Sequence, residues 1–299
     1  QKRGLFVKLC VIGGAGARSA FLTKSLVKST RDIRVDHIVL LDNDQQKLKT
    51  YGEISRELAR RLDPDLTFEV TSDARAALTG VDYIITTIRA GGDAGRLFDE
   101  QTCLAHGVLG QETTGAGGFA MAIRSVPTLV YYCTLAREVA NPGHLIFNFT
   151  NPSGIITQAL RSKGFDNVYG ICDAPSGFIK QLEEILEIPY GTLDIECYGL
   201  NHLSWFRNAK VNGRDVQREL LDKPRTYEHS EMRLFTREMA RISGDCMLNE
   251  YLYFYYRRVK SLSMIQKADH PRGEMIYLIN RELEEQLARL ELPRDFEQA

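Results

Sequence analysis

The sequence has almost no excess charge, because 38 lysines and arginines stand against 39 aspartates and glutamates, a net charge of −1. A near-neutral chain lacks the basic surface with which proteins bind nucleic acid or an anionic membrane, so we expect neither partner. The chain also lacks an apolar run near the roughly 18 residues of a membrane span. Its polar first residues, Gln-Lys-Arg-Gly, are unlike a signal peptide, and we expect none.

Paired cysteines are missing as well, since the six cysteines are scattered along the chain without a CxxC motif. In a chain of 299 residues this pattern indicates reduced thiols in a cytoplasmic protein and not a disulfide scaffold. An isolated cysteine is most often a small buried hydrophobe. Cys172 differs, because it ends an apolar run and is followed at once by polar residues.

Apolar runs without polar alternation are present, with helical patterns between them. They cover residues 5–12, 37–41, 81–88, 145–149 and 168–172. Such runs indicate strands of a parallel sheet that is buried on both faces. With right-handed crossovers this predicts an α/β fold, a Rossmann-like doubly wound parallel sheet.

The pattern changes after about residue 190. Residues 193–198 and 205–211 read as strands, and Asn212-Gly213 is a strong hairpin signal. Helical patterns follow over residues 228–242, 247–260 and 272–291. We therefore predict two domains, with a doubly wound domain at 1–190 and a mixed α+β domain at 191–299.

A glycine-rich turn follows the first predicted strand and opens a helix, with glycines at Gly13, Gly14 and Gly16. Glycine lets the backbone approach a pyrophosphate, which the helix N-terminus then binds. Asp42 ends the second strand, where a carboxylate binds ribose hydroxyls and disfavours a 2′-phosphate. The pattern predicts NAD binding. The alternative is a purely structural turn, because Ser19 replaces the third glycine of the usual fingerprint.

Polar clusters stand where the predicted strands end, the edge at which open α/β sheets bind ligands. Two of them contain Cys172 and His202. A thiolate and an imidazole suit a divalent transition metal, although two ligands leave most coordination positions open. From residue types alone, a core cysteine and a hydrogen-bonded loop histidine are the simpler interpretation.

Three arginines, Arg89, Arg96 and Arg272, are candidates for binding phosphate or carboxylate, because a guanidinium matches such groups in a bidentate way. The alternative for each is a solvated surface arginine. The tyrosine-rich run around Tyr251 has helical spacing, which favours ordinary packing. A tyrosinate beside a metal is nevertheless able to act as a base.

The motifs, taken together, resemble glycoside hydrolase family 4, the NAD- and metal-dependent glycosidases, and especially its 6-phospho-glucosidases. The resemblance covers about residues 8–275. It rests on the glycine turn followed by Ile88-Arg-Ala-Gly-Gly, Arg96-x-x-Asp99-Glu100, Gly110-Gln-Glu-Thr-Thr-Gly, Asn148-x-x-Asn151-Pro, Ile171-Cys172-Asp173, Gly199-Leu-Asn201-His202 and Tyr251-Leu-x-x-Tyr255.

The resemblance implies hydrolysis by oxidation and elimination, an exception to the two-carboxylate scheme of most glycosidases. NAD takes hydride from C3 of the sugar, a base removes the C2 proton and the aglycone leaves C1. Water then adds and the hydride returns, so the cofactor acts catalytically. A divalent metal, typically Mn²⁺, polarises the C3 oxygen. The substrate implied is a 6-phosphorylated sugar.

The resemblance also implies roles for individual residues. Residues 1–190 would bind NAD through the glycine turn and Asp42, and residues 191–299 would complete the substrate and metal site and form a homodimer or homotetramer. Position by position, the roles are metal ligands at Cys172 and His202, the base at Tyr251, the general acid of the α-glycoside members at Asp173, substrate contacts at Arg96 and Asn151, and sugar-phosphate binding at Arg272.

Several alternatives stay open at this point. Asp173 follows the α-type pattern, while Asn148-Phe-Thr-Asn-Pro and Gly199-Leu-Asn-His-Leu follow the β-type at least as well, so both anomers are candidates. An unphosphorylated α-galactoside or α-galacturonide, an NAD-dependent sugar dehydrogenase and a non-catalytic nucleotide-binding sensor are the other candidate functions. Family members usually continue past the Arg272 helix, so we expect the second domain to be incomplete at its C-terminus.

Overall fold

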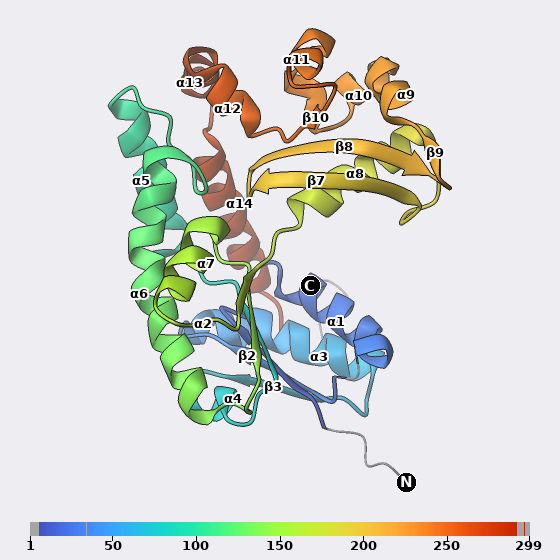
Figure 1. The fold of residues 1–299 in the computed structure, drawn as a ribbon. Helices are drawn as coiled ribbons and strands as arrows, with labels where there is room; N and C mark the ends of the chain where they lie inside the picture. Colours follow the sequence, from blue (N-terminus) through green and yellow to red (C-terminus); the bar gives the residue numbers. More distant parts are fainter. Residues whose placement is uncertain (1–5, 34, 292–295, 297–299) are drawn as a thin grey trace.

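The structure is a computed structural model that describes residues 6–33, 35–291 and 296, and it contains two separate sheets with helices around them (Figure 1). The first sheet is parallel, in the order β3-β2-β1-β4-β5-β6. Its strands are β1 (Lys8–Ile12), β2 (His37–Leu41), β3 (Thr67–Thr71), β4 (Tyr83–Thr86), β5 (Leu145–Asn148) and β6 (Val168–Gly170).

Both faces of the first sheet are covered by helices. On one face Leu9 and Leu40 pack with α1 (Ser19–Ile33) and α3 (Glu53–Leu62). On the other, Cys10 and its neighbours pack against α4 (Ala74–Leu78), α6 (Gly115–Val139) and α7 (Ser153–Ser162). Neighbouring strand residues therefore enter opposite cores, which explains the unbroken apolar runs. The predicted doubly wound α/β fold is confirmed.

Further elements lie between these strands and before the second sheet. They are α2 (Gln45–Lys47), the π-helical turn η1 (Leu48–Gly52), α5 (Gly92–Ala105) and α8 (Ala174–Leu186). Among the described residues, α6 alone is long and apolar enough to cross a membrane, with 39% of the tested window buried. Its Leu129, Cys133 and Ala136 pack on the sheet, as expected of a core helix.

The second sheet is antiparallel, in the order β10-β8-β7, with β9 paired to β8. Its strands are β7 (Leu193–Leu200), β8 (Leu203–Val211), β9 (Arg214–Asp215) and β10 (Met247–Leu248). Asn212 and Gly213 connect β8 to β9 with φ of +51° and +80°. Positive φ at both positions is the geometry of a tight hairpin turn, so the predicted hairpin is confirmed.

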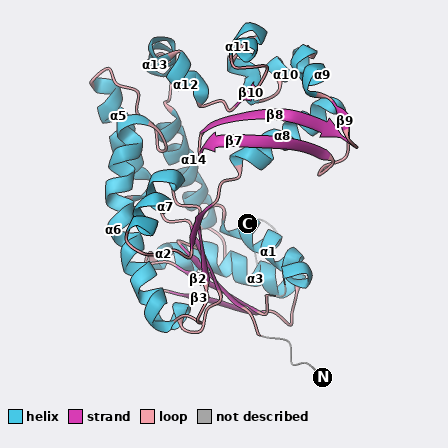
Figure 2. Cartoon of the chain, viewed as in Figure 1, coloured by secondary structure: helices cyan, strands magenta, loops and turns pink. Residues whose placement is uncertain are grey.

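The two sheets have separate hydrophobic cores and occupy separate parts of the molecule (Figure 2). Helix α8 belongs to the second core, because the Phe178 ring packs edge-on against the Phe206 ring at 4.9 Å between centroids. The first helix after Cys172 thus packs with the sheet that carries His202. The domain boundary at residue 190 remains a prediction.

The helical patterns after residue 217 are shorter in the structure than predicted. The elements are α9 (Gln217–Asp222), α10 (Pro224–Glu228), the 3₁₀-helix η2 (Glu231–Leu234), α11 (Arg237–Ile242), α12 (Leu252–Tyr256), α13 (Arg258–Gln266) and α14 (Arg272–Leu287).

The single helix predicted over 228–242 is wrong, because Ser230 and Thr236 each accept a backbone hydrogen bond and begin a new helical segment. The prediction for 247–260 is wrong at its start. There Met247 and Leu248 form β10 against β8.

The first sheet also differs in detail from the prediction. Strand β3 is absent from the predicted set, because the short, polar segment Thr67-Phe-Glu-Val-Thr71 has no apolar run. Strand β1 begins at Lys8, and Leu5 lies outside the described residues. The expectation of an incomplete C-terminal end concerns sequence after residue 299 and stays a prediction; of residues 292–299, only Phe296 is described.

Candidate functional site

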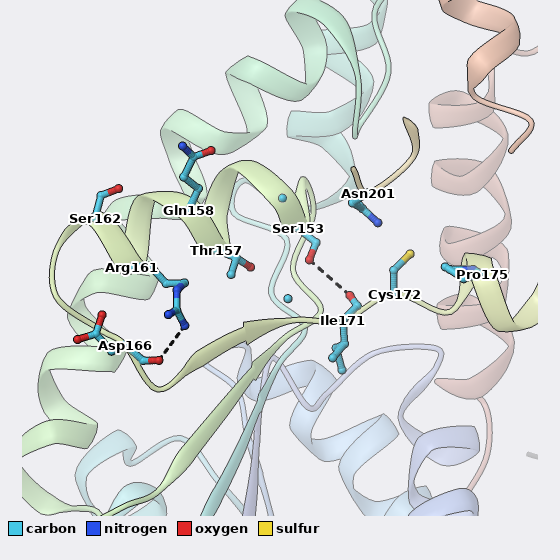
Figure 3. A pocket seen from close by; sticks show the side chains of 12 residues that line it. Ser153, Thr157, Gln158, Arg161, Ser162, Asp166, Ile171, Cys172, Pro175 and Asn201 are labelled. Atoms are coloured by element: carbon cyan, nitrogen blue, oxygen red, sulfur yellow. Dashed lines mark hydrogen bonds between the residues drawn. The ribbon is translucent and has the colours of Figure 1, made fainter. Parts of the chain in front are cut away.

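The ends of three neighbouring strands of the first sheet are joined by buried polar side chains. The Thr86 hydroxyl at the end of β4 donates to Asn148 Oδ1 at the end of β5, at 2.8 Å. Ser153, the first residue of α7, donates to the Ile171 carbonyl after β6, at 3.4 Å (Figure 3). These bonds fix the backbone that leads to Cys172.

Cys172 and His202 come together from different sheets. Cys172 follows β6, and His202 lies in the turn between β7 and β8 with a φ of +57°. The Cys172 Sγ and His202 Nε2 atoms are 3.8 Å apart. Burial lowers the pKa of His202, so its imidazole is neutral near pH 7 and able to ligate a metal.

This pair of atoms fits a divalent transition metal. Metal–sulfur and metal–nitrogen bonds of about 2.3 and 2.1 Å place two ligands of one ion roughly 3–4 Å apart, which includes the observed distance. The buried His202 Nδ1 atom has no hydrogen-bond partner in the described part of the chain. Among the described residues there is no cluster of three or more His, Cys, Asp or Glu side chains, so these two ligands would leave positions for other oxygen donors.

Tyr251 lies directly beside this pair. Its ring centroid is 4.2 Å from that of His202, with 41° between the ring planes. Burial raises the pKa of Tyr251, while a hydrogen bond with the Thr113 side chain and the positive charge of Arg272 act in the opposite direction. The structure therefore brings together the two predicted metal ligands and the predicted base.

Asp173 lies next to Cys172, with 3.9 Å between its Oδ1 atom and Cys172 Sγ. It is exposed and occupies the N-cap position of α8. Asn151 is partly exposed and precedes Pro152 through a cis peptide bond. Both residues stand at the same edge of the first sheet as Cys172.

Two hollows adjoin the Cys172–His202 pair. The larger, of about 790 Å³, extends from Cys172 and Asn201 along α7 to Arg161 (Figure 3). The smaller, of about 150 Å³, is lined by His202 and Asn249 among others. The pair therefore lies between two hollows, and neither is lined by the glycine-rich turn.

The glycine-rich turn is held tightly on the end of β2. The Gly13 and Gly14 amides both donate to the Leu41 carbonyl, at 2.8 and 3.0 Å. Gly13 has a φ of +79°, and a Cβ atom there would lie 2.8 Å from the Ile88 nitrogen. Both facts require glycine at this position.

Two side chains complete the glycine-rich turn. Ser19, at the place of the third fingerprint glycine, accepts from the Gly16 amide and donates to the Gly14 carbonyl. The Asp42 carboxylate accepts from the Ala15 amide at 3.1 Å, and burial raises its pKa. Asp42 thus already supports the turn to which a ribose would bind.

The predicted substrate residue Arg96 is buried between two carboxylates. Its Nε donates to Glu100 at 2.8 Å, and its Nη1 lies 2.9 Å from Glu112. Glu112 also accepts from Arg89 at 2.9 Å. Arg272, in contrast, is exposed at the first position of α14, so its charge is available to a ligand.

Comparison with known proteins identifies the family. Residues 8–188 match the family 4 glycosyl hydrolases, and residues 197–298 match the C-terminal domain of the same family. The chain belongs to glycosyl hydrolase family 4. The predicted resemblance is confirmed.

Individual relatives of this family 4 chain agree with that assignment. A 6-phospho-β-glucosidase from Thermotoga maritima is 30% identical over 97% of the chain, which spans 69% of that relative. A structure of the Thermotoga enzyme with manganese, NAD⁺ and glucose-6-phosphate has a TM-score of 0.84 at 29% identity, covering 98% of this chain and 70% of that one.

A second solved structure belongs to the α-type. This 6-phospho-α-glucosidase from gut microorganisms, in complex with NAD and Mn²⁺, has a TM-score of 0.84 at 27% identity, covering 96% of this chain and 70% of that one. The chain spans only 65% and 59% of the length of two further curated relatives.

Sequence reasoning missed several polar residues around Tyr251. Glu112 and Thr113 belong to the Gly110-Gln-Glu-Thr-Thr-Gly motif of the family resemblance, which implied no role for them. Their proximity to Tyr251 appears only in three dimensions. Glu231 and Asn249 carry no motif signal. Their positions become meaningful only through their hydrogen bonds to the segment that carries Tyr251.

Proposed function

We propose that this family 4 chain cleaves 6-phospho-glucosides by oxidation at C3, removal of the C2 proton and elimination of the aglycone from C1, followed by addition of water and reduction. The observation that carries the proposal is the convergence of Cys172, His202 and Tyr251 from three separate segments. The 6-phospho-glucosidases among the relatives, and the NAD, manganese and glucose-6-phosphate in their structures, support it.

The cofactors of the proposal are NAD and a divalent metal such as Mn²⁺. When bound, NAD supplies a reversible hydride acceptor for C3, and the metal supplies positive charge beside the sugar oxygens. Gly13, Gly14, Gly16 and Asp42 would bind the dinucleotide, and the Cys172 thiolate with the neutral His202 imidazole would ligate the metal.

Tyr251 is the base in this proposal. A ketone at C3 acidifies the C2 proton, which Tyr251 Oη then accepts as a phenolate. Burial and the charges of Glu250 and Glu112 oppose formation of the phenolate, but the hydrogen bond with Thr113 and the charge of Arg272 favour it. The positive charge of a metal ion bound to Cys172 and His202 would favour the phenolate further.

The remaining residues bind the substrate and the leaving group. Arg272 is exposed at the start of α14 and would bind the 6-phosphate, while Asn151 would contact the sugar. Asp173, exposed at the start of α8, would protonate the aglycone oxygen of an α-glycoside. Arg96 keeps a proposed substrate role, although its guanidinium already pairs with Glu100 and Glu112.

The decisive experiment is turnover in D₂O with NAD and Mn²⁺, on 6-phospho-glucosides of both anomers. Removal and return of the C2 proton predicts deuterium at C2 of the glucose-6-phosphate formed. Tyr251→Phe should lower the rate by about 10²–10⁴-fold, the usual contribution of a general base. Tyr255→Phe, an exposed tyrosine of the same helix, is the matched control and should keep the rate.

Two other outcomes would contradict the proposal. Product without deuterium at C2 would indicate direct hydrolysis. Stoichiometric accumulation of NADH would indicate a sugar dehydrogenase, because the glycosidase returns its hydride. If no 6-phospho-glucoside is cleaved, unphosphorylated α-galactosides and α-galacturonides are the next substrates to test.

A further inference from the structure

Asn249 connects the proposed base to the partly buried carboxylate of Glu231. It is only 2% exposed and lies between β10 and Tyr251. Its Oδ1 atom accepts from the Tyr251 backbone amide at 3.1 Å, and its Nδ2 atom donates to Glu231 Oε2 at 2.7 Å. The Asn249 side-chain amide therefore uses both its oxygen and its nitrogen to hold the Tyr251 backbone in place at the start of α12.

Glu231 is the anchor of this arrangement. The same Oε2 atom accepts from the Glu250 amide at 3.1 Å, so one carboxylate oxygen binds two consecutive residues before Tyr251. The Glu231 amide in turn donates to Gln181 Oε1 at 3.0 Å. Gln181 belongs to α8, the helix that begins just after Cys172 and Asp173. Glu231 thus links the segment that bears Tyr251 to the helix that follows Cys172.

We propose that Glu231 is a positioning residue for Tyr251, acting through Asn249 and anchored on α8, so that the proposed base is fixed beside the Cys172–His202 pair. This inference rests on the proposed function of Tyr251 as the base. Glu231 itself touches neither the pair nor a substrate in this arrangement. Its effect is on geometry, and a small misplacement of a reacting group lowers the rate strongly.

The charge state of Glu231 should control how firmly Glu231 positions Tyr251. Burial raises the pKa of Glu231 to about 7, and the neighbouring Glu250 adds to the rise. The Glu250 amide, Arg233 and Asn249 act against it. Glu250 is itself paired with Arg233, and Cys197 on β7 also faces Glu231 among the described titratable groups.

The sign of the pH effect follows from the bonding. Above about pH 7 the carboxylate is ionised, and Oε2 accepts both donors in charge-assisted bonds. Below that pH a proton occupies the carboxyl group and weakens this acceptance. Tyr251 should therefore be fixed better, and kcat should be higher, as the pH rises through about 7.

The test uses Glu231→Gln, which keeps the shape but does not titrate, and Asn249→Leu, which removes the bridge. Glu228→Gln, an exposed glutamate at the end of α10, is the matched control. The protein is labelled with ¹³C at the tyrosine ζ carbon, and the Tyr251 signal is assigned by its loss in Tyr251→Phe. Its shift is followed with pH, alongside kcat and KM for the 6-phospho-glucoside.

The wild type and Glu228→Gln should show a step in the Tyr251 signal near pH 7, and both other variants should lack it. In Asn249→Leu we expect kcat to fall about 10-fold or more with a smaller change in KM. A step that persists in Glu231→Gln, or wild-type kcat and pH profile in both variants, would overturn the proposal. The NMR arm decides the question even if the chain cleaves no 6-phospho-glucoside, because it needs no turnover.

Discussion

At the residue scale, the site depends on a backbone conformation at His202 that the sequence does not predict. His202 adopts a left-handed φ of +57°, which is uncommon for a non-glycine residue and turns the ring toward Cys172. Residue types at strand ends made Cys172 and His202 a candidate pair, but a core cysteine and a loop histidine stayed the simpler interpretation until the family resemblance favoured metal ligands. The 3.8 Å between Cys172 Sγ and His202 Nε2 and the 4.2 Å between the His202 and Tyr251 ring centroids required the structure, because the residues are far apart along the chain.

Cys172→Ser tests whether Cys172 is a metal ligand, as proposed. A serine hydroxyl is a far poorer ligand for a transition metal than a thiolate, so affinity for Mn²⁺ should fall by about 10-fold or more. The measurement is metal binding by calorimetry, with NAD present throughout. Cys197→Ser, on β7 and exposed, is the control and should bind metal like the wild type. Equal affinity in both variants would remove Cys172 from the metal site.

At the scale of elements, the apolar runs predicted most strands of the parallel sheet. The boundaries of the short helices after residue 217 were not predicted, because capping residues set them. Strands with both faces buried have a strong signal, and five of them were predicted with boundaries near those observed. Strand β3 lacks that signal. The short helices after residue 217 depend on Ser230 and Thr236, whose side chains interrupt a pattern that is otherwise helical.

The glycine-rich turn allows two roles of glycine to be separated. Gly13→Ala places a Cβ atom 2.8 Å from the Ile88 nitrogen at a φ of +79°, so we expect a loss of about 1–3 kcal/mol in the free energy of unfolding. Gly16→Ala meets no atom within 4 Å and should leave that free energy nearly unchanged. Urea denaturation measures both.

The same two variants separate folding from cofactor binding. If the turn binds NAD, Gly16→Ala should weaken NAD binding while stability is retained, because its Cβ atom would point toward space that the protein leaves empty. Unchanged NAD affinity in a stable Gly16→Ala protein would argue for a purely structural turn.

At the scale of the whole molecule, α14 ties the end of the described chain to its beginning. Its Gly273 amide donates to the buried Glu100 Oε2 in α5 at 2.8 Å, and Leu287 packs against Tyr51 and Ile54. Because Glu100 also binds Arg96, the N-terminus of α14 and its Arg272 are placed by an ion pair from the first sheet's helices.

Gly273→Ala tests this connection. The added Cβ atom would lie 2.5 Å from Glu100 Oε2, so the carboxylate must move and its hydrogen bond is lost. We expect about 1–3 kcal/mol of destabilisation by urea denaturation, partly offset by the better helix propensity of alanine. Gly177→Ala, in α8 with no atom within 4 Å, is the helical control and should match or exceed the wild type. Equal stability of the two variants would mean that the contact contributes little.

The packing of α8 has a consequence for motion within the molecule. Cys172 immediately precedes this helix, Phe178 inserts into the core of the second sheet, and that sheet carries His202. A rigid-body rotation of the second sheet would carry α8 with it, so the bending point would have to lie before Ala174, the first residue of that helix. Opening and closing would then change the distance from His202 to the glycine-rich turn.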